Sequence, residues 1–349
     1  MGYVSEDEGE IRSAGSTPFR ELSVKESEVL GTLIAYPGLN NSQQSRLTSI
    51  NHSTFVSIRN RLISEGVVGK YNIPSYWAMG GDVIHISMDH SPGGGWGNIE
   101  PSNMWSSKEG SIFEVFDEQI HLSMNVFFNF RDLYMAKEEW ENEVLNMRAP
   151  VTRDTLELSC EGLSFLNFFD HSGLLSGTGG PVESDPITFH ERGKEPREAI
   201  RRAIFGMVND PYSTNKEFAS SLGMNRQTFT SIKDSAISEH LVNPRYLPGL
   251  LRVGMKVIGI FILPLVENAG VDHYEELVRI GSRNRGHIFF DLLSLNTEVI
   301  LTAHRDFDDY QSRVRQTIKT HMEMDLLSRP PNVAPINVVE GGAFGYIRA

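Results

Sequence analysis

The chain has 349 residues, of which 40% are apolar and 22% are charged, a composition typical of soluble globular proteins. Its single cysteine, Cys160, excludes an internal disulfide and fits a reducing compartment. No apolar run approaches the ~18 residues of a membrane-spanning helix, and the acidic N-terminus lacks the apolar core of a signal peptide. We therefore expect a cytoplasmic protein without a membrane partner.

The net charge of −13 argues, by itself, against a nucleic-acid partner. The charge is unevenly distributed, however. Segment 21–77 carries five Lys or Arg and four Asp or Glu residues, and segment 194–254 carries nine and six. The rest of the chain is strongly acidic. Because salt screens charges beyond about 8–10 Å, the local field decides phosphate binding, and these two weakly basic segments are the candidates.

The first of these segments has the pattern of a small helical head. Residues 1–20 are charged and aperiodic, which predicts a disordered tail. Helical spacing of apolar residues predicts helices over 24–36 and 42–47, and a third from Asn51 to about Gly66. Short extended pieces on either side of Gly69-Lys70 predict a wing. This order predicts a winged helix-turn-helix over 21–78.

The third helix is part of an internal repeat. The stretch 51–68, NHSTFVSIRNRLISEGVV, recurs as 225–242, NRQTFTSIKDSAISEHLV, with nine of eighteen positions identical. Each copy begins with an Asn that can cap the helix, and each has a narrow apolar back and a small polar front. Pro37 and Pro211 match at the same offset. The repeat predicts gene duplication within the chain and a second winged head over 196–252.

The duplication extends beyond the heads. Residues 253–349 read as strand, helix, strand, strand, helix, strand, which is the order of a ferredoxin-like domain. Residues 79–169 give most of the same order, with a Gly- and Trp-rich loop around 93–97 in place of the first helix, and a turn-rich linker over 170–195 joins the halves. The expected fold class is α+β: two winged helix-turn-helix heads, each followed by a ferredoxin-like domain, related by a pseudo-two-fold internal repeat.

The run STFVSIRNRLISEGVV resembles the recognition helix and wing of MarR-type and Lrp/AsnC-type transcription regulators of bacteria and archaea. The resemblance rests on Thr54, Phe55, the pair Arg61-Leu62 and the SEGVV that follows. A winged head followed by a ferredoxin-like domain is the Lrp/AsnC layout. It implies DNA binding by the heads, and dimerisation and binding of a small-molecule effector by the second domain.

Candidate DNA contacts follow from the polar helix fronts and from nearby cations. Arg pairs with guanine and Gln with adenine in the major groove, and scattered Lys and Arg position the phosphate backbone. The expected base-reading residues are His52, Ser53, Ser57, Arg61, Arg226, Gln227 and Ser231. The expected backbone contacts are Arg46 and Lys216 on the second helices and Lys70 and Arg245 at the wings. The covalent pair of heads predicts a pseudo-dimer within one chain, and a homodimer of whole chains is left open.

The sequence gives no positive sign of catalysis. His85, Asp89 and His90 could suggest a metal site, but a structural histidine within a strand is the simpler interpretation. The loop 93–97 lacks the Lys-Ser/Thr of a phosphate loop, and Cys160 fits a buried apolar position. We expect no enzyme, no cofactor and no metal. The alternative function is a protein–protein adaptor of the transcription machinery, with the winged heads as docking modules, or an effector-sensing regulator.

Overall fold

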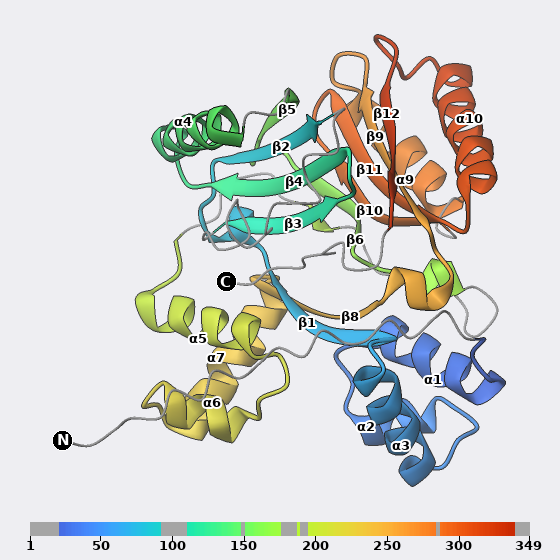
Figure 1. Ribbon diagram of the computed structural model, residues 1–349. Coiled ribbons are helices and arrows are strands. Elements are labelled where there is room, and N and C mark those ends of the chain that lie inside the picture. The colour runs from blue at the N-terminus through green and yellow to red at the C-terminus, as the bar shows by residue number, and fades with distance from the viewer. Residues whose placement is uncertain are drawn as a thin grey trace.

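The computed structural model describes residues 21–91, 110–147, 151–175, 187–188, 195–283 and 287–338, and the loop predicted at 93–97 lies outside them. Two helical heads lie below two β-sheets, and a long two-stranded ribbon runs between the two levels (Figure 1). In the described part of the chain, no helix is long and apolar enough to cross a membrane.

The first head comprises α1 (Val24–Ala35), α2 (Asn41–Arg46) and α3 (His52–Ser64). Side chains close each N-terminus: Ser23 and Asn40 form capping boxes with the third residue of their helices, and Asn51 accepts from the Thr54 amide. The apolar back of α3 is fully removed from water at Phe55 and Leu62. The head therefore has a small core of its own, built from the predicted helical stripes.

The second head repeats this arrangement with α5 (Glu198–Asn209), α6 (Asn215–Ser221) and α7 (Arg226–Ser238). Thr214 caps α6 with a capping box, and Asn225 caps α7 by accepting from the Gln227 amide. Phe218 and Phe229 stack in the core with ring centroids 5.3 Å apart. The two caps Asn51 and Asn225 occupy the same place in their heads, as the repeat predicts.

The predicted wings do not form within each head. The strand that leaves each third helix, β1 (Val68–Pro74) and β8 (Val242–Pro248), pairs antiparallel with the other over its whole length, from Val68 opposite Pro248 to Pro74 opposite Val242. The prediction of a separate wing around Gly69-Lys70 is therefore wrong. Each strand gains its hydrogen bonds from the other repeat, so the ribbon ties the heads together.

The first sheet has the order β3-β4-β2-β5, built from β2 (Val83–His90), β3 (Ser111–Phe116), β4 (Ile120–Phe127) and β5 (Thr152–Ser159). Helix α4 (Phe130–Met147) lies beside it. A one-turn 3-10 helix, Tyr76–Met79, connects the ribbon to β2. This strand order is that of a ferredoxin-like domain, and its first connection falls on residues outside the described chain.

The second sheet has the same order, β12-β9-β11-β10, extended by one strand that follows the first sheet and one from the linker. It is built from β9 (Val257–Pro264), β10 (Ile288–Leu293), β11 (Thr297–His304) and β12 (Asn332–Asn337). Helices α8 (Ala269–Asp272), α9 (Tyr274–Arg283) and α10 (Phe307–Glu323) belong to this half. Strand β6 (Ser164–Phe168) pairs with β10, and β7 (Ile187–Thr188) pairs with β6. The apolar stretch 163–169 of the predicted first domain thus contributes a strand to the second sheet.

The pairing registers confirm the α+β class and the internal repeat. Val83 lies opposite Phe127 in the first sheet, and the equivalent Val257 lies opposite His304 in the second. One continuous apolar cluster includes Ile86 and Met124 of the first sheet and Leu292 and Leu301 of the second. The backbone amide of Asn337 also donates to the Asp117 carboxylate at 3.0 Å, which links the two halves. The two halves therefore share one core, which is what a pseudo-dimer inside a single chain requires.

Candidate functional site

The fronts of α3 and α7 face solvent. His52, Ser53 and Ser57 are exposed on α3, and Arg226, Gln227 and Ser231 are exposed on α7. Ser53 donates to the Asn51 cap at 2.9 Å, so it has only a local partner in its own head. These six predicted reading residues are accessible to a large ligand, because the apolar back of each helix packs against its head and the opposite side faces solvent.

The other predicted contacts on the heads divide into two groups. Arg46 on α2 and Lys216 on α6 are exposed, as backbone contacts should be. Arg61 is not available in the same way, because its guanidinium forms a 2.8 Å ion pair with the buried Glu26 of α1. That pair fastens α3 to α1, while the Arg61 side chain remains 52% exposed, so its contact with bases stays a prediction.

The two cations predicted at the wings, Lys70 and Arg245, lie on the strands β1 and β8, which pair with each other. Arg245 is partly buried and donates from Nε to the Phe168 carbonyl at 3.0 Å, an interior contact to the strand β6. Burial lowers the pKa of the Arg245 guanidinium. Lys70 faces the space between the heads. The prediction of Arg245 as a phosphate contact is therefore wrong, and Lys70 belongs to a different site.

That site is a cleft of about 320 Å³ between the heads, lined by equivalent residues of the two repeats. Arg59 of α3 and Lys233 of α7 occupy matching positions, and Lys70 extends from β1 beside them. At 100° per residue, Arg59 projects about 120° from Ser53 and about 20° from His52, so it lies on the same side of α3 as His52. The described residues that line the cleft include these three cations and no carboxylate.

The three cations repel one another. Burial lowers the pKa of the Lys70 ammonium, and the charges of Lys233 and Arg59 lower it further, while Asp210 opposes them. Arg59 donates to the Tyr246 hydroxyl at 3.3 Å, and its buried Nε has no hydrogen-bond partner among the described residues. Lys233 donates to Asn215 at 3.2 Å. Neutral partners hold these cations in place without neutralising them, so the cleft attracts anions.

The three cleft cations show what sequence reasoning missed. Of them, only Lys70 was expected at a functional site, and for a different reason. The signal for the other two was present in the repeat, because Arg59 aligns with Lys233 and a basic residue recurs on the same flank of both third helices.

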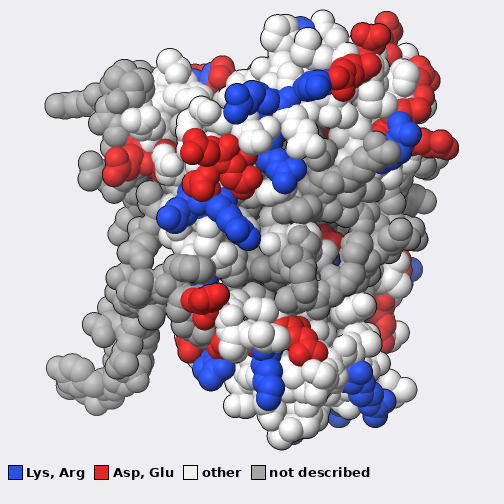
Figure 2. Space-filling model, turned by 90° about the vertical axis from the view of Figure 1, so that its right-hand side faces the viewer, with Lys and Arg blue, Asp and Glu red and all other residues white. Residues whose placement is uncertain are grey.

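One face of the molecule shows how charge is distributed outside the cleft. On the face drawn in Figure 2, acidic and basic side chains are interspersed over both the upper and the lower parts of the molecule. The cleft is thus a local concentration of positive charge on a chain with net charge −13.

A second unusual region is the face of the first sheet opposite the shared core. Cross-strand pairs on this face are polar and buried: Asp89 with His121, Ser87 with Ser123, and His85 with Asn125. The equivalent pairs of the second sheet are Leu263 with Glu298, Phe261 with Ile300, and Gly259 with Thr302. The second sheet is thus apolar at Leu263, Phe261 and Ile300 and polar at Glu298 and Thr302, whereas all six residues of the first sheet are polar.

The centre of this polar face is His121. Its Nε2 lies 2.6 Å from Glu114, its Nδ1 lies 3.4 Å from Asp89, and Asp89 also accepts two hydrogen bonds from Arg153. Burial opposes a charge on His121, but the hydrogen bonds to Asp89 and Glu114 outweigh it and raise the pKa of the imidazole to about 9. Asp89 therefore serves His121 and Arg153 and does not form the metal cluster with His85 and His90 that was considered from sequence.

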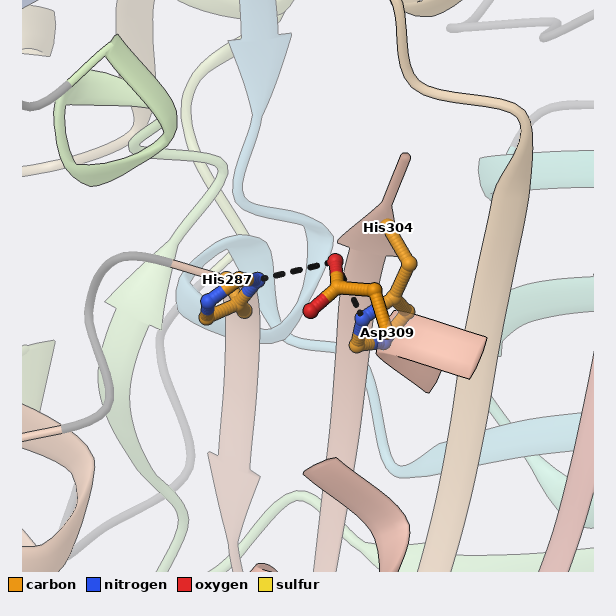
Figure 3. Close-up of side chains that lie close together, drawn as sticks. All are labelled: His287, His304 and Asp309. Carbon is orange, nitrogen blue, oxygen red and sulfur yellow. Dashed lines mark ion pairs between the residues drawn. The ribbon is translucent and has the colours of Figure 1, made fainter. Parts of the chain in front are cut away.

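A third cluster lies at the end of the second sheet. His287 precedes β10, His304 ends β11 and Asp309 lies in the first turn of α10, with the carboxylate between the two imidazoles (Figure 3). Burial lowers the pKa of both His287 and His304, the latter to about 4, so both rings are neutral at pH 7. This cluster can hold a metal ion.

Comparison with solved structures finds partial similarities. The siroheme decarboxylase NirDL matches over 93% of this chain and 93% of its own, at 12% identity and a TM-score of 0.47. An AsnC family transcriptional regulator from Agrobacterium tumefaciens matches over 40% of this chain and 89% of its own, at 10% identity and a TM-score of 0.32. E. coli AsnC matches over 40% and 91%, at 11% identity and a TM-score of 0.31. No protein-family model and no curated protein sequence matches the chain.

These comparisons support the Lrp/AsnC resemblance in part, since each AsnC regulator matches less than half of the chain. They do not support the MarR resemblance. The expectation that the chain is not an enzyme is contradicted, because the structure that matches across both repeats is that of an enzyme.

Proposed function

We propose that the chain binds double-stranded DNA as a single-chain pseudo-dimer, with α3 and α7 at the major groove and the cleft between the heads on the phosphate backbone. The cleft carries this proposal. The described residues that line the cleft supply three cations and no carboxylate, and Asp210, outside the lining, offsets only part of the repulsion on Lys70. A DNA backbone passing between the two heads supplies the missing negative charge. In this arrangement the polar fronts of α3 and α7 and the cleft contact the same DNA molecule.

We infer a duplex rather than a free anion from the pairing of the heads. Dimeric helix-turn-helix proteins place two reading helices about 34 Å apart along the DNA, one helical turn. Here the β1–β8 ribbon holds the heads as a pair, so binding of the second head is intramolecular and adds avidity. A free phosphate would engage the cleft alone, whereas DNA engages the cleft and both helix fronts.

The two reading fronts differ, so we expect an asymmetric binding site. Head two presents Arg226 and Gln227, and head one presents His52 and Ser53. Arg226→Ala is expected to cost about 1–3 kcal/mol at one half of the site, because a bidentate Arg–guanine contact has that value. Selection of bound fragments from random DNA measures this.

The matched control is His52→Ala, which should relax preference in the other half only. A palindromic consensus that neither substitution alters would contradict the proposal.

A salt titration of DNA affinity distinguishes a DNA-binding protein from the alternative, a protein–protein adaptor. A DNA-binding chain loses affinity with salt at a slope of about −0.9 per phosphate contacted. An adaptor shows no DNA binding even at low salt.

A second candidate function is catalysis at the polar face of the first sheet. The observation that favours it is the buried imidazole of His121 between Glu114 and Asp89, which is protonated at neutral pH and lies beside the Arg153 guanidinium. Because both ring nitrogens face Glu114 and Asp89, a substrate would have to displace one of these carboxylates before the imidazole could supply a proton. The second repeat has Leu263 where the first has Asp89, and a buried imidazole there, that of His321, has Glu298 at 2.8 Å from Nε2.

Siroheme is the first probe for this candidate, since a structure that aligns with 93% of this chain is that of a siroheme decarboxylase. The assay would follow conversion of siroheme by mass spectrometry under anaerobic conditions. Loss of turnover in His121→Gln, with turnover retained in His90→Gln, would support catalysis. Absence of any spectral change when siroheme is added to the wild-type chain would exclude siroheme as its substrate.

A further inference from the structure

The cluster of His287, His304 and Asp309 forms a compact set of ligand atoms. His304 Nδ1 lies 3.5 Å and His287 Nδ1 lies 3.9 Å from Asp309 Oδ2. All the ligand atoms lie within 4.8 Å of one another. Two ligands at about 2.1 Å from a tetrahedral zinc ion are about 3.4 Å apart, so a small movement of these side chains closes them on one ion.

Hydrogen bonding fixes which nitrogen of His304 faces the cluster. The Thr302 hydroxyl lies 3.3 Å from the Gly259 carbonyl and 2.7 Å from His304 Nε2. When the hydroxyl donates to Gly259 it accepts from Nε2, and in that tautomer Nδ1 presents a lone pair to the cluster. Metal-bound histidines are commonly held in this way, by a hydrogen bond at the other nitrogen.

The arrangement brings three electron-rich atoms together. Neither His287 Nδ1 nor His304 Nδ1 has a hydrogen-bond partner among the described residues, although both are buried atoms. Asp309 Oδ2 accepts a backbone hydrogen bond of 3.3 Å from Arg305, and Arg313 lies 4.0 Å from the other carboxylate oxygen. A lone pair directed at a carboxylate is unfavourable unless a cation lies between them.

The first repeat shows that this cluster is not part of the duplicated fold. The His287 carbonyl accepts from Ala303 as Gly110 accepts from Val126, so His287 is equivalent to Gly110. His304 is equivalent to Phe127. The backbone amide of Asp309 donates to the side chain of Asp306, three residues earlier, and the amide of Asp132 donates to Asn129 in the same way. Asp309 is therefore equivalent to Asp132. Only the carboxylate is common to both repeats, and both histidines are additions of the second.

We propose that His287, His304 and Asp309 bind one divalent transition-metal ion per chain, of the zinc or ferrous iron class, with water completing its coordination. Two imidazoles and one carboxylate suit these ions, and three protein ligands leave positions open. The ion would fasten the ends of β10 and β11 to the start of α10. This proposal does not depend on DNA binding or on the site in the first sheet.

The test is titration of the metal-free chain with Co²⁺, followed by displacement with Zn²⁺. We expect visible absorption bands of bound Co²⁺ that saturate at one equivalent, and a higher thermal unfolding midpoint, because a ligand of the folded state stabilises it. The double variant His287→Gln/Asp309→Asn should lose both effects. These side chains are partly exposed, so the variant should fold, as circular dichroism can verify.

Two further variants sharpen the result. Asp132→Asn, at the equivalent position of the first repeat, should keep one equivalent of metal. Thr302→Val removes the hydroxyl that orients His304 and should weaken binding about 10–100-fold. Retention of one equivalent by the folded double variant, or no Co²⁺ spectrum in the wild-type chain, would overturn the proposal.

Discussion

Asp89→Asn is expected to lower the free energy of unfolding by about 3–5 kcal/mol, because it removes one partner from a buried network of charges. Asp89 is fully buried and accepts hydrogen bonds from Arg153, while its second oxygen lies 3.4 Å from His121. The amide cannot neutralise either cation, and neither can escape easily to water. Urea unfolding monitored by circular dichroism measures the change.

The control is Asp154→Asn, since Asp154 is largely exposed and lies 4.0 Å from His90. Its effect should be within about 0.5 kcal/mol. A loss in Asp89→Asn no larger than that of the control would show that the network contributes little to folding.

The same network sets an alkaline limit to stability. The pKa of His121 is about 9 in the folded chain against 6.5 in the unfolded chain, so its contribution is complete below pH 6.5 and is lost as pH rises through 9. The size is on the order of 3 kcal/mol, from 1.36 kcal/mol per pKa unit. His121→Gln should flatten the decline in stability between pH 6.5 and 9.5. An unchanged decline in that variant would assign it to other groups.

The helices of the heads were predictable because their signals are local. Caps such as Asn51 and Asn225 and the apolar stripe through Phe55 act within one or two turns. The ribbon was not predictable in the same way. The sequence of β1 is compatible with a wing or with pairing to β8, and only the closeness of the two heads in the folded chain decides between them.

The sites were harder to predict because their residues come from distant elements. Arg59 and Lys233 are 174 positions apart, and each alone resembles an ordinary surface cation. The polar face had a visible signal, since His85, Ser87 and Asp89 alternate with apolar residues along β2. Their convergence on His121 depends on the register of β2 against β4, which the sequence does not specify. The metal-ligand cluster likewise requires the register of β10 and β11.

The double variant Arg59→Glu/Lys233→Glu is expected to weaken DNA binding by at least about 100-fold at 0.15 M salt. It removes two of the three cleft cations and adds two carboxylates where we place the phosphate backbone. The slope of log affinity against log salt should also fall by about 2, because two phosphate groups are no longer neutralised by the protein. Fluorescence anisotropy of a labelled duplex measures both quantities.

Lys319→Glu is the matched control, because Lys319 is an exposed cation on α10, far along the chain from the heads. Its DNA affinity should be close to that of the wild-type chain, since charges separated by more than about 8–10 Å are screened. An equal loss in this control would mean that net charge, rather than the cleft, controls binding. Unchanged affinity in the double variant would remove the cleft from the DNA-binding site.

The substitution Lys70→Met tests whether the three cleft cations bind an anion or contribute only to folding. Repulsion from Arg59 and Lys233 and partial burial oppose the charge on Lys70, so its removal should leave the free chain as stable or more stable. The same substitution should weaken DNA binding and reduce the salt slope by about 1. A site maintained for folding would lose stability instead. The opposite signs for stability and binding follow only if the three cations are held together for an anion that the free chain lacks.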